Sequence, residues 1–211
     1  MLIKVCGMRD PGNIREVARC GIDMMGFIFY PKSPRYAAAL QPGTIARLKA
    51  DGIEPVALFV DEPAGHVTAT CSRYGFTTVQ LHGSESADCC DRLRGSGLKV
   101  LKALGIGAKE DIGRAKLYDG HADMLVLDTA CATKGGSGRK FDWNLLAAAD
   151  FSTPYLLSGG ISPDDAAAVR ETYRRCAPLM AGVDLNSRFE TAPGLKSTTL
   201  LSDFISKCNQ L

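Results

Sequence analysis

The sequence predicts an α/β protein, specifically a single-domain (β/α)8 barrel, also called a TIM barrel. Two patterns along the 211 residues support this prediction: eight short apolar runs of strand length recur, and amphipathic helical patterns separate them. The runs are mostly continuous, which is typical of parallel strands covered by helices. Eight strand–helix units close naturally into a barrel, here near its minimum length, with a doubly wound open sheet as the alternative. No linker or low-complexity segment divides the chain, so residues 1–211 are expected to form one domain.

Each expected strand is an apolar run that ends at a turn-forming or chemically active residue. In chain order, strands are expected at residues 2–6, 23–30, 54–60, 77–81, 98–104, 123–128, 154–158 and 180–185. The first breaks at Gly7, and the second leads into a loop fixed by Pro31 and Pro34. The sixth ends on a carboxylate, Asp128, and the seventh ends at Gly159. The fifth is more amphipathic than the others.

Helices are expected between these strands, where apolar residues recur with helical spacing. In chain order, they are expected at residues 11–20, 42–50, 62–74, 84–94, 108–118, 142–149, 162–174 and 197–208. Gly21 closes the first helix, and Pro42 stands at an early position of the second. Gly113 is expected to break the fifth. Asp142 and Ser162 are placed to cap the sixth and seventh helices.

Composition excludes several classes of protein. The net charge of +2, with scattered basic residues, gives no support for nucleic-acid or anionic-membrane binding. No segment approaches the ~18 apolar residues of a membrane helix. The eight cysteines form neither a CxxC pair nor a Cys/His group with zinc-ligand spacing, and no signal-peptide pattern is present. A reducing, cytoplasmic location without disulfides is therefore expected.

Chemically active residues gather at the ends of the expected strands. Active sites of (β/α)8 barrels lie at the carboxyl ends of their strands. The residues found there, or in the loops that follow, are Cys6, Arg35, His82, Asp128, Gly159, Gly160, Asp184, Asn186 and Ser187. Each one alone has an ordinary structural explanation, such as a buried Cys or a Gly-Gly turn. Together they mark one face of one fold, which predicts an active site there.

The loops after the seventh and eighth expected strands are typical of a phosphate site. Barrel enzymes commonly bind phosphate after their seventh and eighth strands, through backbone N–H groups and a helix N-terminus. Gly159 and Gly160 would let the backbone approach an anion closely, while Asn186 and Ser187 could add side-chain donors. The sequence thus predicts a small phosphorylated substrate and requires no metal.

Cys6 and Asp128 end strands on opposite sides of the expected barrel mouth. A ligand across the mouth could meet a thiol on one side and a carboxyl group on the other, which suits acid–base chemistry. Burial would raise the carboxyl pKa, and a nearby cation or backbone donors would lower the thiol pKa. We therefore expect both pKa values to move toward neutrality.

The strand-end motifs also resemble a known family. KVCGM, GFIFYPKSPRY, VALFV, VQLHGSE, LVLD, KGGSGRKFDW, LLSGGIS, GVDLNSRFE and PGLK follow one another as in phosphoribosylanthranilate isomerase of tryptophan biosynthesis. The resemblance covers almost the whole chain. It implies a single barrel that needs no cofactor and converts N-(5-phosphoribosyl)anthranilate into 1-(2-carboxyphenylamino)-1-deoxyribulose 5-phosphate, an Amadori rearrangement.

The resemblance also implies a role for each site residue. Cys6 would be the general base and Asp128 the general acid. Arg35 would hold the anthranilate moiety, through its carboxylate or by stacking. The remaining substrate-binding residues would be His82, Gly136, Ser137, Gly138 and Asp184. The phosphate would be bound by Gly159, Gly160, Asn186 and Ser187.

The chain departs from the family pattern after the eighth strand. Where the family usually reads Val-Ser-Ser-Gly-Val-Glu, residues 185–190 read LNSRFE. Asn186 keeps a hydrogen-bond donor. Arg188 replaces a glycine, which removes backbone freedom and adds a charge close to the expected phosphate site.

Other functions fit the sequence less well. Indole-glycerol-phosphate synthase uses a lysine acid, and none of the strand ends named above presents one. A histidine-pathway sugar isomerase relies on paired aspartates, but the first strand here ends in Cys6. Both Cys6 and Asp128 argue against a non-catalytic barrel that only binds a phosphorylated ligand. No resolving cysteine is placed to support a redox sensor. The chain is expected to act as a monomer or homodimer on a small phosphorylated molecule.

Overall fold

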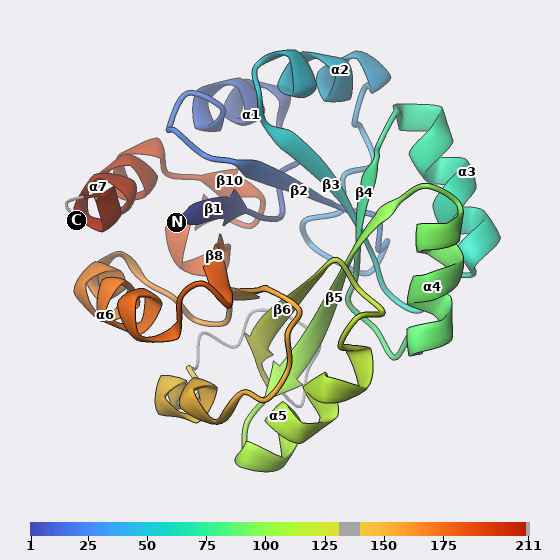
Figure 1. Cartoon of the computed structure of the whole chain (residues 1–211). Helices are drawn as coiled ribbons and strands as arrows, with labels where there is room; N and C mark the ends of the chain where they lie inside the picture. Colours follow the sequence, from blue (N-terminus) through green and yellow to red (C-terminus); the bar gives the residue numbers. More distant parts are fainter. Residues whose placement is uncertain (131–139, 210–211) are drawn as a thin grey trace.

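The computed structural model describes residues 1–130 and 140–209, and its centre is a closed barrel of eight parallel strands (Figure 1). The strands are β1 (Leu2–Val5), β2 (Met24–Ile28), β3 (Glu54–Phe59), β4 (Thr78–Leu81), β5 (Lys99–Ile106), β6 (Met124–Thr129), β7 (Tyr155–Leu157) and β8 (Met180–Leu185). Each strand pairs with the next along the chain, and β8 pairs with β1. The predicted (β/α)8 barrel is confirmed, and the open-sheet alternative is wrong.

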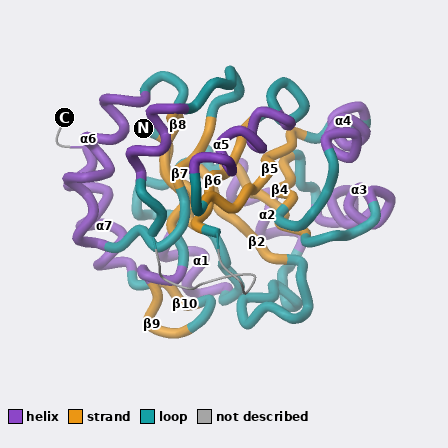
Figure 2. The backbone as a smooth tube through the Cα atoms, turned by 90° about the horizontal axis from the view of Figure 1, so that it is seen from below, coloured by secondary structure: helices purple, strands orange, loops and turns teal. Residues whose placement is uncertain are grey.

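Helices surround the barrel, which both views show from different directions (Figures 1 and 2). The α-helices are α1 (Pro11–Val17), α2 (Pro42–Ala50), α3 (Ala64–Tyr74), α4 (Ala87–Gly95), α5 (Lys109–Ala115), α6 (Ala166–Cys176) and α7 (Thr198–Asn209). Short 3-10 helices are η1 (Lys116–Tyr118), η2 (Trp143–Ala148), η3 (Pro163–Asp165) and η4 (Ser187–Phe189). None of the helices in the described part of the chain is long and apolar enough to cross a membrane.

Two expected helices differ from their predictions. The segment 142–149 forms the 3-10 helix η2, with backbone bonds such as Leu145 N to Asp142 O at 3.0 Å. Asp142 still caps it, because its carboxylate accepts a bond from the backbone N–H of Asn144 at 3.0 Å. Helix α5 runs through Gly113, whereas we expected a break there. Gly113 is exposed, while its neighbour Ile112 is buried and anchors the helix on the barrel.

Buried side chains form one layer outside the barrel and smaller layers within it. The large apolar core lies between strands and helices, as alternation along each strand requires. A separate cluster that includes Val56, Val126 and Leu156 fills part of the barrel interior. Nearer the carboxyl ends, Cys6 packs with Ile28 and Leu58. This last cluster forms part of the floor of the cavity described below.

A small hairpin that the sequence analysis missed follows the eighth strand. It consists of β9 (Glu190–Ala192) and β10 (Leu195–Lys196), with Gly194 at a φ of 82° in the turn. Asn13 of α1 fastens it, because its amide accepts from Lys196 N at 2.7 Å and donates to Lys196 O at 2.8 Å. The Pro193-Gly194 dipeptide was the sequence signal for this turn.

Candidate active site

A cavity of about 540 Å³ opens at the carboxyl ends of the barrel strands. The structure brings together there every predicted site residue that it describes: Cys6, Arg35, His82, Asp128, Gly159, Gly160, Asp184, Asn186 and Ser187. The predicted contacts Gly136, Ser137 and Gly138 lie outside the described residues. The topology explains the gathering, because all eight parallel strands point their carboxyl ends to the same rim.

Cys6 lies just past the end of β1 and is 3% exposed. Gly26 on β2 leaves room for it, since a Cβ at Gly26 would lie 2.7 Å from the Cys6 sulfur. Burial raises the pKa of the Cys6 thiol, and the positive charges of Lys4 and Lys196 oppose this only in part. The expectation of a lowered thiol pKa is therefore wrong in direction, because desolvation of the thiolate outweighs the nearby cations.

Lys4 is a buried cation beneath the cavity that the sequence analysis overlooked. Its Nζ donates to Oδ2 of Asp184 at 2.8 Å, and side-chain exposure is 0% for Lys4 and 5% for Asp184. Burial alone would lower the pKa of Lys4, but the negative charges of Asp184 and Cys6 raise it overall. The signal was a lysine inside the apolar run LIKVC, since a buried charge requires a partner.

Asp128 and His82 face each other across the cavity rim. Nε2 of His82 lies 3.4 Å from Oδ2 of Asp128, whose side chain is 27% exposed. Gln80, buried on β4, donates from Nε2 to Nδ1 of His82 at 3.0 Å. With Nδ1 accepting that bond, the neutral ring carries its proton on Nε2, toward Asp128. Gln80 thus orients the imidazole, and the sequence analysis did not single it out.

Gly159 is required by the close approach of β7 to β6. Its φ is 87°, and a Cβ there would lie 2.7 Å from Oδ1 of Asp128 and would overlap the backbone N of Thr129. The same Oδ1 accepts a bond from Thr129 N at 2.8 Å. Any side chain at position 159 would therefore displace the Asp128 carboxylate or the backbone behind it.

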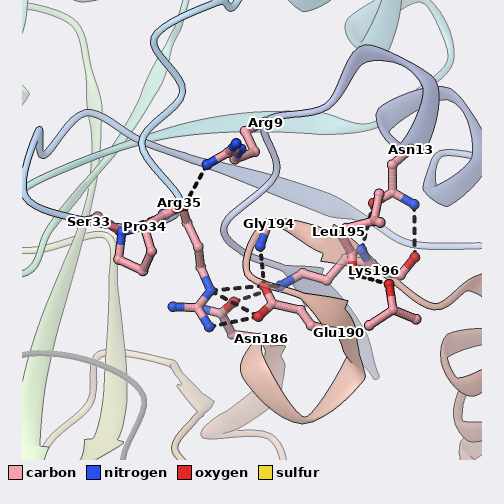
Figure 3. A network of polar contacts seen from close by, with 11 residues as sticks. Arg9, Asn13, Ser33, Pro34, Arg35, Asn186, Glu190, Gly194, Leu195 and Lys196 are labelled. Carbon is pink, nitrogen blue, oxygen red and sulfur yellow. Dashed lines mark hydrogen bonds and ion pairs between the residues drawn. The ribbon is translucent and has the colours of Figure 1, made fainter.

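Arg35 belongs to a charged network built by the C-terminal hairpin (Figure 3). Its Nε donates to Oε1 of Glu190 at 2.9 Å, and its Nη2 donates to Oε2 at 2.7 Å. Buried Lys196 donates to Oε1 of Glu190 and to Oδ1 of Asn186, both at 2.6 Å. Burial alone would raise the pKa of Glu190, but the hydrogen bond from Arg35 and the charge of Lys196 lower it overall. The carboxylate therefore stays ionised between two cations.

The loops after β7 and β8 present donors to the cavity. Gly159 and Gly160 both have positive φ, 87° and 66°, which turns the backbone sharply after β7. The Asn186 carbonyl oxygen accepts from Lys196, so the amide presents its Nδ2 group as a donor. Ser187 begins η4 and also lines the cavity, whereas Arg188 is exposed. Backbone and side-chain donors of this kind suit an oxyanion.

A second buried ion pair supports the loop that carries His82. Lys102 on β5 donates to Oε2 of Glu85 at 2.8 Å and to the carbonyl of Gly83 at 2.8 Å. Glu85 also accepts from the backbone N–H groups of Asp61, at 2.8 Å, and Gly83, at 2.9 Å.

Within residues 1–130 and 140–209, no group of three or more His, Cys, Asp or Glu side chains is arranged to hold a metal ion.

Comparison with known proteins gives consistent matches. The family model described as N-(5'phosphoribosyl)anthranilate (PRA) isomerase matches residues 3–207. A protein of Parabacteroides distasonis named N-(5'-phosphoribosyl)anthranilate isomerase is 42% identical over 209 residues, covering 98% of this chain and 93% of the relative. A protein of the same name from Phocaeicola vulgatus is 39% identical over 210 residues, covering 100% and 98%.

Solved structures agree with the sequence matches. Phosphoribosyl anthranilate isomerase from Thermotoga maritima superposes with a TM-score of 0.84 at 30% identity, with full coverage of both chains. A further structure of a phosphoribosyl anthranilate isomerase is a complex with reduced 1-(o-carboxyphenylamino)-1-deoxyribulose 5-phosphate. It superposes with a TM-score of 0.80 at 28% identity, again with full coverage.

Proposed function

Because the chain belongs to the N-(5'-phosphoribosyl)anthranilate isomerase family of tryptophan biosynthesis, we propose that Cys6 and Asp128 act as general base and general acid in its Amadori rearrangement. The observation that carries this assignment is their common cavity: Cys6 after β1 and Asp128 on β6 both line it. A substrate across the cavity would meet the two groups from different sides.

In the proposed sequence, Asp128 first protonates the furanose ring oxygen. The bond from C1 to that oxygen breaks, and the nitrogen lone pair forms a protonated Schiff base at C1. The Cys6 thiolate then removes the proton from C2, and these electrons neutralise the nitrogen to give an enolamine. Loss of the enol proton and protonation at C1 give the ketone. Because burial raises its pKa, the Cys6 thiolate is a minor species at neutral pH but a strong base.

The proposal assigns the anthranilate end of the substrate to Arg35. Glu190 binds Nε and Nη2 of Arg35, which fixes the plane of the guanidinium at the cavity wall. A fixed plane suits either a carboxylate or a stacked aromatic ring. His82 and Asp184 line the same cavity and would contact the sugar. Gly136, Ser137 and Gly138 remain proposed substrate contacts.

The proposal assigns the phosphate to the loops after β7 and β8. Gly159 and Gly160 supply backbone at positive φ, and Asn186 and Ser187 supply side-chain donors. The structure with a bound 5-phosphate analogue belongs to a relative, and its ligand supports a phosphorylated substrate for this chain. No metal or organic cofactor has a step in this sequence.

The experiment that tests the proposal follows the fluorescence of phosphoribosylanthranilate mixed with purified, reduced protein. Wild-type protein should convert the substrate, and dialysis against a chelator should leave the rate unchanged. The double variant Cys6→Ser/Asp128→Asn, checked for folding by circular dichroism, is the matched control and should be inactive. Absence of turnover in the wild type would contradict the proposed function, whereas turnover by the folded double variant would contradict the residue assignment.

The location and assembly of the chain remain proposals. A cytoplasmic location agrees with a biosynthetic family of this kind. For the assembly, a phosphoribosylanthranilate isomerase of Thermotoga maritima is described as dimeric. Sedimentation of the purified chain would distinguish the expected monomer from the expected homodimer.

A further inference from the structure

Lys4 shares one face of β1 with Cys6 and binds a buried carboxylate, that of Asp184. Lys4 and Cys6 are two positions apart at the end of β1, so strand alternation turns both side chains into the barrel. Lys4 pairs with Asp184 in the β1–β8 register, and their side chains are joined at 2.8 Å. The positive charge of the same ammonium group also acts on Cys6, where it opposes the rise in the thiol pKa that burial causes.

Asp184 is only partly satisfied by this pair. Oδ2 binds Lys4, while Oδ1 is buried and has no hydrogen-bond partner in the described part of the chain. A carboxylate that bound Lys4 through both oxygens would accept hydrogen bonds from more of the N–H groups of the ammonium. The single contact uses one N–H group of Lys4, and an ammonium carries three donors, so N–H groups remain that could donate to a thiolate at Cys6.

We propose that Lys4 is a positioning residue for the rearrangement, whose buried ammonium stabilises the Cys6 thiolate at the floor of the cavity, and that Asp184 limits how strongly it does so. This inference rests on the proposed role of Cys6. It assigns no contact with substrate to Lys4, which is fully buried below the cavity.

Charged groups on the other elements around Cys6 act in both directions. Lys196 of β10 favours the thiolate, and Arg35, after β2, interacts with Cys6 electrostatically as well. Asp184 of β8 opposes the thiolate, and Asp128 and His82 act in turn on Asp184. Lys4 exerts the largest of the charge effects on Cys6. Removing Lys4 should therefore affect Cys6 more than removing any other of these groups.

The test measures the rate at which iodoacetamide alkylates Cys6 as a function of pH, read by mass spectrometry of the Cys6 peptide. This readout needs no substrate, so it stands apart from the proposed function. Lys4→Met should slow alkylation at neutral pH about tenfold or more and move the midpoint to higher pH, because an adjacent opposite charge typically shifts a pKa by about 1–3 units. Asp184→Asn should move the midpoint to lower pH. Cys20, on the outer side of the barrel after α1, is the internal control.

Lys102→Met is the matched control variant. It also removes a buried barrel lysine from a 2.8 Å carboxylate pair, but that pair joins β5 to the loop after β4. Its Cys6 profile should equal that of the wild type. If Lys4→Met does not fold, the double variant Lys4→Met/Asp184→Asn avoids an unpaired buried charge and should still show a midpoint above the wild-type value, because Lys4 affects Cys6 more than Asp184 does.

Turnover measurements complete the test. Lys4→Arg, which keeps the positive charge, should recover most of the alkylation rate and most of kcat. A Cys6 profile that is unchanged in Lys4→Met, or shifted equally in Lys102→Met, would overturn the inference even if the wild type is an active isomerase. A shifted profile in a protein without turnover would instead support the inference and contradict the proposed function.

Discussion

Arg35 and Glu190, 155 residues apart in the sequence, form a two-pronged ion pair at the wall of the cavity, with N–O distances of 2.7–3.1 Å. Glu190 is 5% exposed at its side chain and Arg35 is 14% exposed. A pair of this geometry fixes the plane of the guanidinium as well as its position. Glu190 therefore orients Arg35, and Gln80 orients His82 in the same way. Both are buried groups that hold a residue of the cavity in place.

Glu190→Gln should weaken substrate binding. The amide keeps the shape of the side chain but loses one acceptor and the negative charge, so Arg35 is no longer held in one plane. We expect KM to rise about tenfold with a smaller change in kcat, as is typical when ground-state and transition-state binding are lost together. Steady-state kinetics measure this, with the exposed Glu171→Gln on α6 as control. An unchanged KM would show that Arg35 needs no such support.

Cys6→Ser and Asp128→Asn should each lower kcat by about 10²–10⁴, the usual contribution of a general base or acid. Serine is far less acidic than cysteine, and asparagine has no proton to give the ring oxygen. Binding should survive, because phosphate and anthranilate contacts are untouched. Titration of each variant with the product analogue, alongside single-turnover rates, separates the two effects. A Cys6→Ser variant with wild-type kcat would make Cys6 a packing residue and leave Asp184 as the nearest candidate base.

Activity should increase toward alkaline pH. Burial raises the pKa of Cys6 above its ordinary value, so the fraction of thiolate keeps growing with pH through and beyond the ordinary thiol range near ~8.5. Since kcat/KM reports groups of the free enzyme, its rising limb should lie in that alkaline range. Initial rates at low substrate concentration measure it, with circular dichroism at each pH as the folding control. A plateau already reached below pH ~7 would be inconsistent with a buried thiol as base.

Inorganic phosphate should compete with the substrate. The backbone at Gly159 and Gly160, with the donors of Asn186 and Ser187, presents partial positive charge to an anion. Phosphate should raise the apparent KM without changing kcat. Ionic strength must be held constant with chloride, because Arg188 is exposed close by and its long-range attraction is screened by salt. The double variant Asn186→Ala/Ser187→Ala should be inhibited less. Equal inhibition by chloride would argue against a phosphate site.

Gly159→Ala and Gly113→Ala should have opposite effects. At position 159 a Cβ meets Asp128 Oδ1 at 2.7 Å and the φ of 87° is strained for alanine, so both stability and kcat should fall. At position 113, exposed within α5, a Cβ meets no atom within 4 Å and alanine is the better helix former, so stability should rise by about 0.5–1 kcal/mol. Thermal unfolding and kcat, measured on both variants, check this contrast. Equal stability changes would contradict it.

The sequence contains enough information to predict the barrel and the rim residues, but not the contacts between them. An apolar run such as the one ending at Asp128 predicts a strand by itself, because hydrophobic periodicity and run length depend only on neighbouring residues. The Lys4–Asp184 and Arg35–Glu190 pairs do not, because each depends on how distant strands and loops meet after closure. The pKa direction of Cys6 was wrong for the same reason: burial is a tertiary property that spacing along the chain does not report.

The pairing of β1 with β8 has a consequence for synthesis on the ribosome. Strand β1 leaves the ribosomal exit tunnel early, but β8, one of its two neighbours in the barrel, follows much later. Asp184 on β8 lies 180 residues after its partner Lys4. Until that segment emerges, the edge of β1 carries unpaired backbone groups, and Lys4 must remain hydrated. The nascent chain therefore cannot close its barrel by adding units in order, because closure pairs the first barrel strand to be synthesised with the last. A stalled ribosome holding a chain that stops before β8 should present an open edge for chaperones to bind.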